Sequence, residues 1–159
     1  AATVTCIDSS SAMLRVARRK PELEGVSFIE SDFRDPWPAG PYDVVASTFC
    51  LFALEPDDLQ ATISRAHRVL RPGGVFVTGC VFRPETREEE TRCLAGWEAF
   101  MRDAGLDAAE IRRELTAWDG ARTRIPTRDL FGTMLKTAGF SMARWPYSEG
   151  LYGVVVAVR

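Results

Sequence analysis

Short apolar runs typical of β-strands alternate with segments of helical periodicity along the first half of the chain. The runs are rich in β-branched and aromatic residues and cover positions 3–8, 26–30, 42–47 and 75–82. Apolar residues recur every three or four positions in two segments between them, 13–17 and 59–70. This alternation predicts an α/β fold with a mostly parallel sheet, and the apolar run at 42–47 is typical of a strand buried on both faces.

A charged segment, residues 83–126, interrupts the alternation. Its periodicity predicts two helices with a break near Gly105. The polar residues are expected to form one solvated face: Glu88, Glu89, Glu90, Arg92 and Arg102. The apolar residues are expected on the opposite face: Leu94, Trp97, Phe100 and Met101.

The end of the chain is predicted to form one more helix and two strands. Thr127 is placed to cap the helix and Gly139 to end it, with an apolar stripe of Leu130, Phe131, Met134, Leu135 and Ala138. Strands are predicted at 140–147 and 151–158, with a short turn between them. Two strands joined by so short a turn must pair antiparallel. We therefore expect a single domain over residues 1–159, with residues 83–126 as a helical insertion before the last helix.

Composition and charge limit the class of protein and the kinds of binding partner that the chain can have. Hydrophobic residues make up 46% of the 159 residues and charged residues 26%, which excludes a disordered, collagenous or coiled-coil chain. Lys and Arg total 20 against 22 for Asp and Glu, giving a net charge of −2. Such a balance supplies no general basic field and disfavours a nucleic-acid partner. No apolar stretch approaches the roughly 20 residues of a membrane span, so no membrane partner is expected.

The cysteine and histidine content argues against a metal site. Cys6, Cys50 and Cys80 lie in or next to strand-like runs and are expected to be reduced and buried, which suggests the cytoplasm. Cys93 is the fourth cysteine and His67 the only histidine, so no zinc-ligand pattern exists. His67 lies in the predicted second helix and is interpreted as structural or surface-exposed.

Four motifs occur in a characteristic order: VTCIDSS, ESDF, YDVVAS followed by TFCLFAL, and ISRAHRVLRPGGVFVT. With the closing helix and hairpin, they resemble the class I S-adenosylmethionine-dependent methyltransferases over almost the whole chain. The resemblance implies a Rossmann-like sheet with an antiparallel C-terminal hairpin. A looser similarity links the insertion and tail to the carboxy-S-adenosylmethionine synthase subgroup. Leu115 stands near the position expected for that subgroup's arginine for the cofactor carboxylate, so that contact is in doubt.

The resemblance implies a site for S-adenosylmethionine, or S-adenosylhomocysteine after transfer. Asp8 stands where a carboxylate accepts hydrogen bonds from the two ribose hydroxyls, for which an acceptor-only group is suited. The alternative interpretation is that Asp8 only supports the start of the next helix. Ser9 and Met13 would lie beside the adenosine.

The adenine and the transferred methyl group are assigned to the next two strand ends. Ser31, Asp32 and Phe33 stand where the family holds adenine, with the acid accepting from the exocyclic amine and an apolar side chain against the ring. Phe33 is equally well explained as ordinary core. The tripeptide Ser47, Thr48 and Phe49 would lie next to the methyl group, with Phe49 facing the substrate. Its alternative is a loop that only closes the sheet edge.

Further substrate contacts are assigned to the insertion, where the family often builds a lid. Trp97 and Met101, with Phe100 and Trp118, would line an apolar pocket, although such stripes are more often core packing. An arginine cluster of Arg122, Arg124 and Arg128 would hold an anionic group, or form a solvated basic loop. No catalytic residue is assigned, because in-line methyl transfer depends on alignment more than on a dedicated base. The sequence STFC lacks the Asp/Asn-Pro-Pro-aromatic signature, which disfavours amino-group methylation of bases.

One departure from the family is the absence of the first strand, Gly-rich turn and helix before Asp8. The family places that strand between the strands predicted at 3–8 and 42–47. Without it, these two would lie roughly 9.6 Å apart, twice the ordinary spacing. We expect a strand and helix of about 30 residues or more to precede Ala1 in the gene product. Otherwise the strands would close up, or another chain would fill the slot, which makes a homodimer plausible.

The sequence leaves three functional hypotheses. The first is transfer of a methyl group from S-adenosylmethionine to a small molecule. The alternative is a truncated binding or regulatory protein that keeps the fold without catalysis. A nicotinamide-dependent dehydrogenase also places an acid after its second strand, but the closing hairpin and the LRPGG turn disfavour it.

Overall fold

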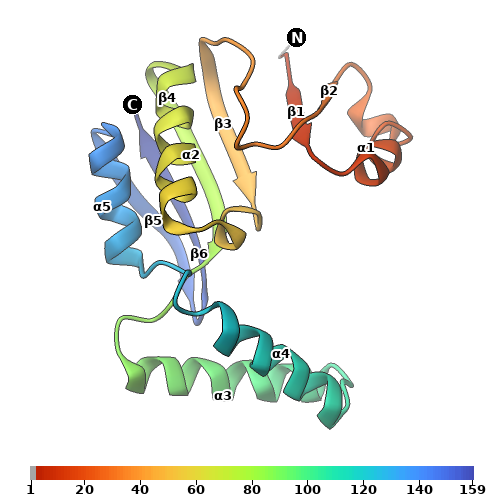
Figure 1. Cartoon of the computed structure of the whole chain (residues 1–159), viewed down its shortest axis with the longest axis vertical. Coiled ribbons are helices and arrows are strands. Elements are labelled where there is room, and N and C mark those ends of the chain that lie inside the picture. Colours follow the sequence, from red (N-terminus) through yellow and green to blue (C-terminus); the bar gives the residue numbers. More distant parts are fainter. Residues whose placement is uncertain (1–2) are drawn as a thin grey trace. The chain divides into compact units, whose positions relative to one another are not determined.

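The computed structural model describes residues 3–159. The chain separates into two compact units, Ala1–Ala39 and Gly40–Arg159, which are described in turn. Figure 1 colours the two units from red through orange and from orange to blue. The expectation of one domain over residues 1–159 stays a prediction.

The first unit is a β-α-β arrangement. Strands β1 (Thr5–Asp8) and β2 (Ser27–Glu30) pair in parallel, with helix α1 (Ser11–Ala17) and a short 3-10 turn, η1 (Pro21–Leu23), between them. Ser10 begins the helix, since its hydroxyl accepts the Met13 amide at 3.3 Å. Leu14 is the buried residue of α1, whereas Met13 is exposed.

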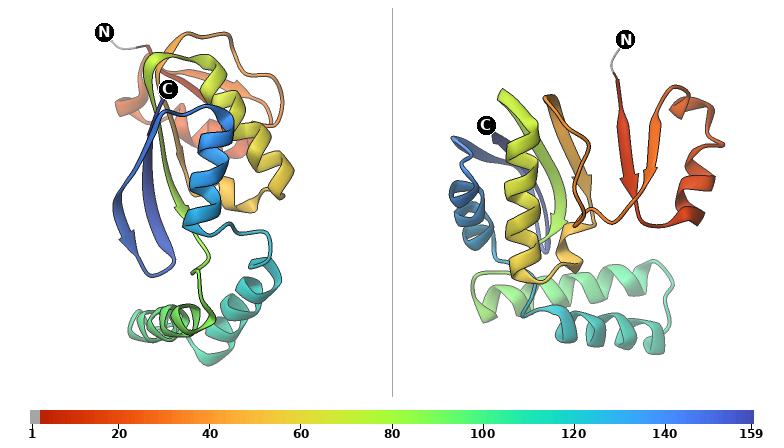
Figure 2. Two further views of the ribbon diagram at one scale, coloured as in Figure 1. Left: turned by 90° about the vertical axis from the view of Figure 1, so that its left-hand side faces the viewer. Right: turned by 45° about the horizontal axis from the view of Figure 1, so that its top comes forward.

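The second unit is built on a four-stranded sheet of order β3-β4-β6-β5. Its strands are β3 (Tyr42–Thr48), β4 (Leu70–Val81), β5 (Met142–Glu149) and β6 (Tyr152–Val158). The pair β3–β4 is parallel, and β4–β6 and β5–β6 are antiparallel, which confirms the closing hairpin. Helices α2 (Pro56–Val69) and α5 (Arg128–Ala138) lie on the same side of this sheet, as Figure 2 shows.

The sheet arrangement differs from the predicted single, mostly parallel sheet. The described strands form two sheets, and two of their four pairings are parallel. The resemblance places a further strand between those at 3–8 and 42–47, and the described residues contain no strand that pairs with both. The alternation of strands and helices and the C-terminal antiparallel hairpin are nevertheless present.

The core of the second unit lies between the sheet and the α2–α5 pair. The predicted α2 stripe is buried: Leu59, Ile63, Ala66 and, just past the helix, Leu70. Alternate residues of the central strands face it, Phe76, Thr78 and Cys80 from β4 and Gly153, Val155 and Ala157 from β6. A Cβ at Gly153 would lie 3.1 Å from the Phe82 ring, so glycine there admits the phenylalanine. Thr127 caps α5, and Gly139 ends it at φ +103°, as predicted.

The other face of the sheet is not covered by any helix of residues 40–159. Val44 is 55% exposed, and the residues level with it on β4 and β6 are only half-buried. The expectation that the run at 42–47 is buried on both faces is therefore wrong. The reason is position, because β3 is an edge strand of its sheet with helices on one face only.

Strand β4 begins earlier than predicted and includes the Pro-Gly-Gly sequence. The pairing of β3 with β4 shifts in register between Tyr42 and Val44, opposite the start of β4. Pro72 lies in this stretch and has no backbone N–H to donate to the neighbouring strand. Gly73 adopts φ +75°, and its N–H donates to the Arg159 carbonyl at 3.0 Å. The turn that follows α2 is thus part of the sheet.

The insertion forms two helices, as predicted: α3 (Arg87–Asp103) and α4 (Ala108–Ala121). A capping box at Asp107 begins α4. The predicted faces are partly wrong, because Glu90 is buried while Phe100 is 68% exposed. In α5, Leu130 of the predicted stripe is likewise exposed. Glu90 departs from the simple periodicity because it has partners on α4, Trp118 and Arg122.

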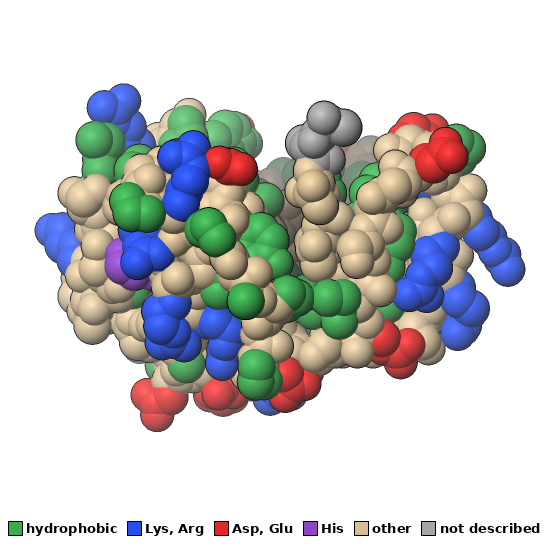
Figure 3. All heavy atoms as spheres, turned by 90° about the horizontal axis from the view of Figure 1, so that it is seen from above, with side chains coloured by type: hydrophobic (Ala, Val, Ile, Leu, Met, Phe, Trp, Pro, Cys, Tyr) green, Lys and Arg blue, Asp and Glu red, His purple; other side chains and the backbone are tan. Residues whose placement is uncertain are grey.

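His67, a residue of α2, packs against Gly139 and Phe140 at the end of α5, as expected of a structural histidine. Its ring meets Phe140 edge-on at 5.1 Å between centroids, and Figure 3 shows it reaching the surface. Burial, and secondarily the nearby Arg159 charge, lower the pKa of His67, against the opposing hydrogen bond at Gly139.

This environment predicts a pH dependence of stability. Because the folded-state pKa lies below the unfolded value of 6.5, the contribution of His67 is fully present above pH 6.5. It declines as the pH falls below that value, where the unfolded chain binds the proton first. Urea unfolding of the wild type and His67→Gln between pH 8 and pH 5 should show a steeper loss in the wild type. Parallel profiles would contradict the assignment.

Candidate active site

The first unit places an acidic side chain after each of its parallel strands. Asp8 ends β1, and its Oδ1 accepts the backbone N–H of Ser10 at 2.7 Å. Asp8 therefore does support the start of α1, as the alternative interpretation has it. Each carboxylate oxygen has more than one lone pair, so this bond leaves acceptor capacity that fits a ribose hydroxyl. Ser9 and Met13 are exposed nearby in sequence.

Asp32 follows β2 and is held by Arg34. The Arg34 Nη2 lies 2.6 Å from Asp32 Oδ2, its Nε 3.0 Å from Oδ1, and its backbone N–H also donates to Oδ1. These hydrogen bonds lower the pKa of Asp32 to about 2, so the group is an ionised acceptor at neutral pH. An ionised carboxylate suits the exocyclic amine of adenine.

The neighbours of Asp32 complete this loop. The Ser31 hydroxyl donates to the Asp32 carbonyl at 3.3 Å and lies equally far from Asp35 Oδ2. Phe33 is half-buried, and its carbonyl accepts the Trp37 indole N–H at 2.7 Å. The loop is thus ordered by its own polar groups, and the roles of Ser31, Asp32 and Phe33 toward adenine stay predictions.

The second unit gathers polar and aromatic residues where β3 and β4 end. The Ser47 hydroxyl lies 3.0 Å from the Cys50 sulfur, and Thr48 is exposed at the last position of β3. Phe49 then adopts φ +51°, and its N–H donates to the Gly79 carbonyl at 2.8 Å. A bulky residue in this region costs on the order of 1–3 kcal/mol, and such strain gathers at functional sites.

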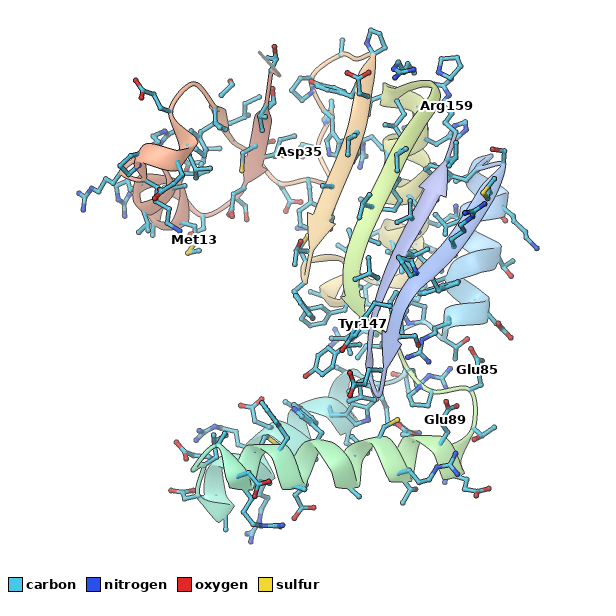
Figure 4. The ribbon with its side chains drawn as sticks, turned by 180° about the vertical axis from the view of Figure 1, so that it is seen from behind. Met13, Asp35, Glu85, Glu89, Tyr147 and Arg159 are labelled. Atoms are coloured by element: carbon cyan, nitrogen blue, oxygen red, sulfur yellow. The ribbon has the colours of Figure 1, made fainter. Side chains whose placement is uncertain are left out.

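The backbone at Phe49 presents its ring to solvent. The ring is 51% exposed and meets Tyr152 edge-on at 5.9 Å between centroids. Tyr152 lies opposite Glu149 in the hairpin, and the Tyr147 hydroxyl donates to Glu149 Oε2 at 2.8 Å, which raises the pKa of Tyr147. Figure 4 shows Tyr147 on this hairpin. An exposed aromatic group therefore borders the ends of β3 and β4.

Sequence reasoning missed Tyr147 and Tyr152. The available signal was a pair of tyrosines flanking the Ser-Glu-Gly turn, one directly before it and one two residues after it. Nothing in the sequence places that turn beside Phe49, because the contact depends on β6 pairing with β4 rather than on local pattern.

The substrate residues predicted in the insertion lie in packing positions. Met101 is buried, and Trp97 packs against a small core of Trp118, Ile125 and Leu151. The core-packing alternative accounts for both, so their substrate role stays a prediction without structural support. Leu115 lines a separate hollow between α3 and α4.

The predicted arginine cluster does not converge on one point. Arg122 pairs with Glu90, Arg124 Nη1 lies 3.1 Å from Glu55 Oε1, and Arg128 donates to the Gly150 carbonyl at 2.8 Å. Each guanidinium has its own protein partner, so the role of this cluster toward an anionic group stays a prediction without structural support.

All four cysteines are free; Cys80 is buried, which raises its thiol pKa to about 11, but Cys6 and Cys50 are only half-buried. The expectation of burial is wrong for those two, because each lies in or next to a strand with an uncovered side.

Within residues 3–159, no three His, Cys, Asp or Glu side chains gather as metal ligands. No helix of this described part has the length and apolar character needed to cross a bilayer.

Comparison with known proteins begins with a family model described as a methyltransferase domain, which matches residues 1–74. An uncharacterized methyltransferase of Synechocystis sp. is 30% identical over 144 residues, covering 90% of this chain and 58% of that protein. A human tRNA N(3)-cytidine methyltransferase is 26% identical over 146 residues, covering 86% and 34%. Carboxy-S-adenosyl-L-methionine synthase of Aeromonas hydrophila is 27% identical over 161 residues, covering 98% and 64%. The chain thus spans about a third to two thirds of the length of these relatives.

A solved structure supports the same fold. The N-methyltransferase NodS of Bradyrhizobium japonicum, solved with S-adenosyl-L-homocysteine, matches 99% of this chain and 66% of its own with a TM-score of 0.61 at 16% identity. At that identity the match establishes the fold and nothing finer. The family model, the sequence relatives and the motif order agree with it. Residues 1–74 thus match the model of a methyltransferase domain, and the chain is similar to S-adenosylmethionine-dependent methyltransferases in sequence and fold.

Proposed function

We propose that this chain carries the adenosine-binding and acceptor-side residues of an enzyme that methylates a small molecule. The observation that carries the proposal is the placement of two acids at the carboxyl ends of the adjacent parallel strands: Asp8 is the last residue of β1, and Asp32 lies two residues beyond the end of β2. Ligands of open α/β sheets bind outside the carboxyl ends of the strands. When bound, S-adenosylmethionine supplies an electrophilic methyl group on its sulfonium sulfur.

The residues of this chain have distinct parts in the proposal. Asp8 accepts from the ribose hydroxyls and Asp32, kept ionised by Arg34, accepts from the adenine amine. Thr48 and Phe49 border the acceptor, and the exposed ring of Phe49 contacts its apolar part. These groups bind and orient, which is the main requirement of an in-line displacement.

The acceptor class is the less constrained part of the proposal. The relatives differ in the reactions their names state, so no acceptor is common to them. The net charge of −2 favours a small molecule over tRNA. The free cysteines support a cytoplasmic setting, and the unpaired edge of β3 supports a homodimer.

The test is binding of S-adenosylhomocysteine to the chain and to Asp8→Asn, measured by isothermal titration calorimetry. Loss of a hydrogen bond to a charged group costs about 1.5–3 kcal/mol, so the affinity of Asp8→Asn should fall about 10- to 100-fold. A matched control is Asp119→Asn, an exposed acid of α4, which should bind like the wild type.

Two outcomes would count against the proposal. Equal affinities of the Asp8 and Asp119 variants would remove Asp8 from the site. A folded wild-type chain that shows no binding would favour the alternative, a binding or regulatory protein that keeps the fold without using the cofactor.

A further inference from the structure

The second unit contains a cavity away from the strand ends, where the insertion joins the sheet. It has a volume of about 320 Å³ and lies between the β4–α3 connection and the end of α4. Its lining includes Arg83, Thr86, Arg87, Glu90, Arg122 and Thr123. Three guanidinium groups therefore border one small space.

The acidic groups of this cavity are already engaged. Glu90 accepts from Arg122 through both carboxylate oxygens, one of them at 2.9 Å from Nε. Glu90 Oε1 also accepts the Trp118 indole N–H at 3.0 Å. Glu85, labelled in Figure 4, accepts the backbone N–H of Asp129 at 3.1 Å, at the start of α5. Arg122 therefore balances the charge of Glu90, whereas Glu85 keeps its negative charge and already accepts a backbone N–H.

The other two arginines make no side-chain hydrogen bond or ion pair of this kind among residues 3–159, although the charge of Arg83 acts on Glu90. The Nε of Arg83 is buried and has no hydrogen-bond partner. Arg87 is exposed at the first position of α3, and no hydrogen bond or ion pair of its guanidinium is found among residues 3–159. A buried donor without an acceptor is costly, and native structures rarely leave one unsatisfied.

We propose that this cavity binds a small oxyanion, either a phosphate group or a carboxylate, between Arg83 and Arg87. The planar guanidinium group matches both anions by paired N–H donors. A volume of 320 Å³ is at the small end of ligand pockets, so the site takes a small anion or the charged end of a larger molecule. None of its residues belongs to the proposed cofactor site, so the proposal stands apart from methyl transfer.

The experiment titrates the chain with sodium phosphate or with sodium acetate at constant ionic strength. The wild type should show saturable binding to at least one anion, with amide chemical-shift changes confined to residues near 83–90 and 122–127. Arg87→Gln should weaken that binding about tenfold. Arg113→Gln, an exposed arginine of α4 outside the cavity, should leave it unchanged. The anion that binds more tightly identifies the ligand as a phosphate or a carboxylate.

Two results would overturn the proposal. One is the absence of saturable binding to both anions. The other is an equal loss of affinity in Arg87→Gln and Arg113→Gln, which would indicate a diffuse charge effect. Arg83→Gln tests the buried donor, and because Arg87 is exposed, its variant remains informative even if the Arg83 variant fails to fold.

Discussion

Replacement of Glu90 by alanine will lower the free energy of unfolding by about 3 kcal/mol. Removing one member of a buried ion pair costs roughly 3–5 kcal/mol, because the other charge is left without a partner. The lower figure applies here since the Arg122 side chain retains 26% of its exposure. The Trp118 indole N–H also loses its acceptor. Chemical denaturation followed by tryptophan fluorescence measures the effect.

The control is Glu88→Ala in the same helical turn. Glu88 is exposed and lies 3.7 Å from Arg92, a surface pair worth at most about 1 kcal/mol. Hydrogen exchange should show faster opening of α3 and α4 in the Glu90 variant only. Equal losses of stability in the two variants would contradict the role assigned to Glu90.

The pH dependence of this pair has a defined sign. Burial disfavours the ionised form of Glu90, but the hydrogen bonds from Arg122 and Trp118 and the charge of Arg83 outweigh it and lower its pKa. The stabilisation is therefore complete above the ordinary value of 4.5 and is lost as the pH falls through the folded-state pKa. The stability difference between wild type and Glu90→Gln should shrink in that range.

Replacement of Phe82 by alanine should cost about 3–5 kcal/mol, the usual range for a buried phenylalanine. Its ring is fully buried and meets Phe131 at 5.3 Å and Trp145 at 4.9 Å between centroids, both edge-on. Gly153 lies against the same ring and has no side chain that could fill the cavity. The loss of unfolding free energy is measured from the denaturant midpoints of the wild type and Phe82→Ala, provided that the two proteins have the same m-value.

Phe100→Ala is the matched control for this core position. The Phe100 ring is 68% exposed on α3, and surface substitutions usually change stability by no more than about 0.5 kcal/mol. A similar loss in both variants would show that the Phe82 cluster is less tightly packed than its ring geometry indicates.

Local chemistry made most of the elements predictable. Ser10 and Thr127 begin helices through side-chain bonds to the following turn, and Gly139 ends one in the left-handed region. These signals depend on a few neighbouring residues and can be read directly from the sequence. The acids at the strand ends were predictable for a different reason, namely the order of the family's motifs.

Features that depend on distant partners were not predictable. Glu90 belongs by periodicity to a charged face, but its partners Trp118 and Arg122 lie 28 and 32 residues further along. The exposure of Val44 depends on which face of the sheet the helices cover, which an apolar run does not specify. The positive φ of Phe49 and its contact with Tyr152 likewise arise from strand pairing.

The two ends of the insertion lie side by side. The Arg83 N–H donates to the Pro126 carbonyl at 3.0 Å, and Arg83 bridges Thr127 in parallel fashion. The chain therefore leaves the sheet and returns to it at one point, and α3 and α4 form an insertion between these two segments. Insertions at such surface points are tolerated because they leave the backbone pairing of the scaffold intact. The helical insertion can therefore be replaced in evolution, with a change in what the protein recognises, while β4, α5 and the core between them are retained.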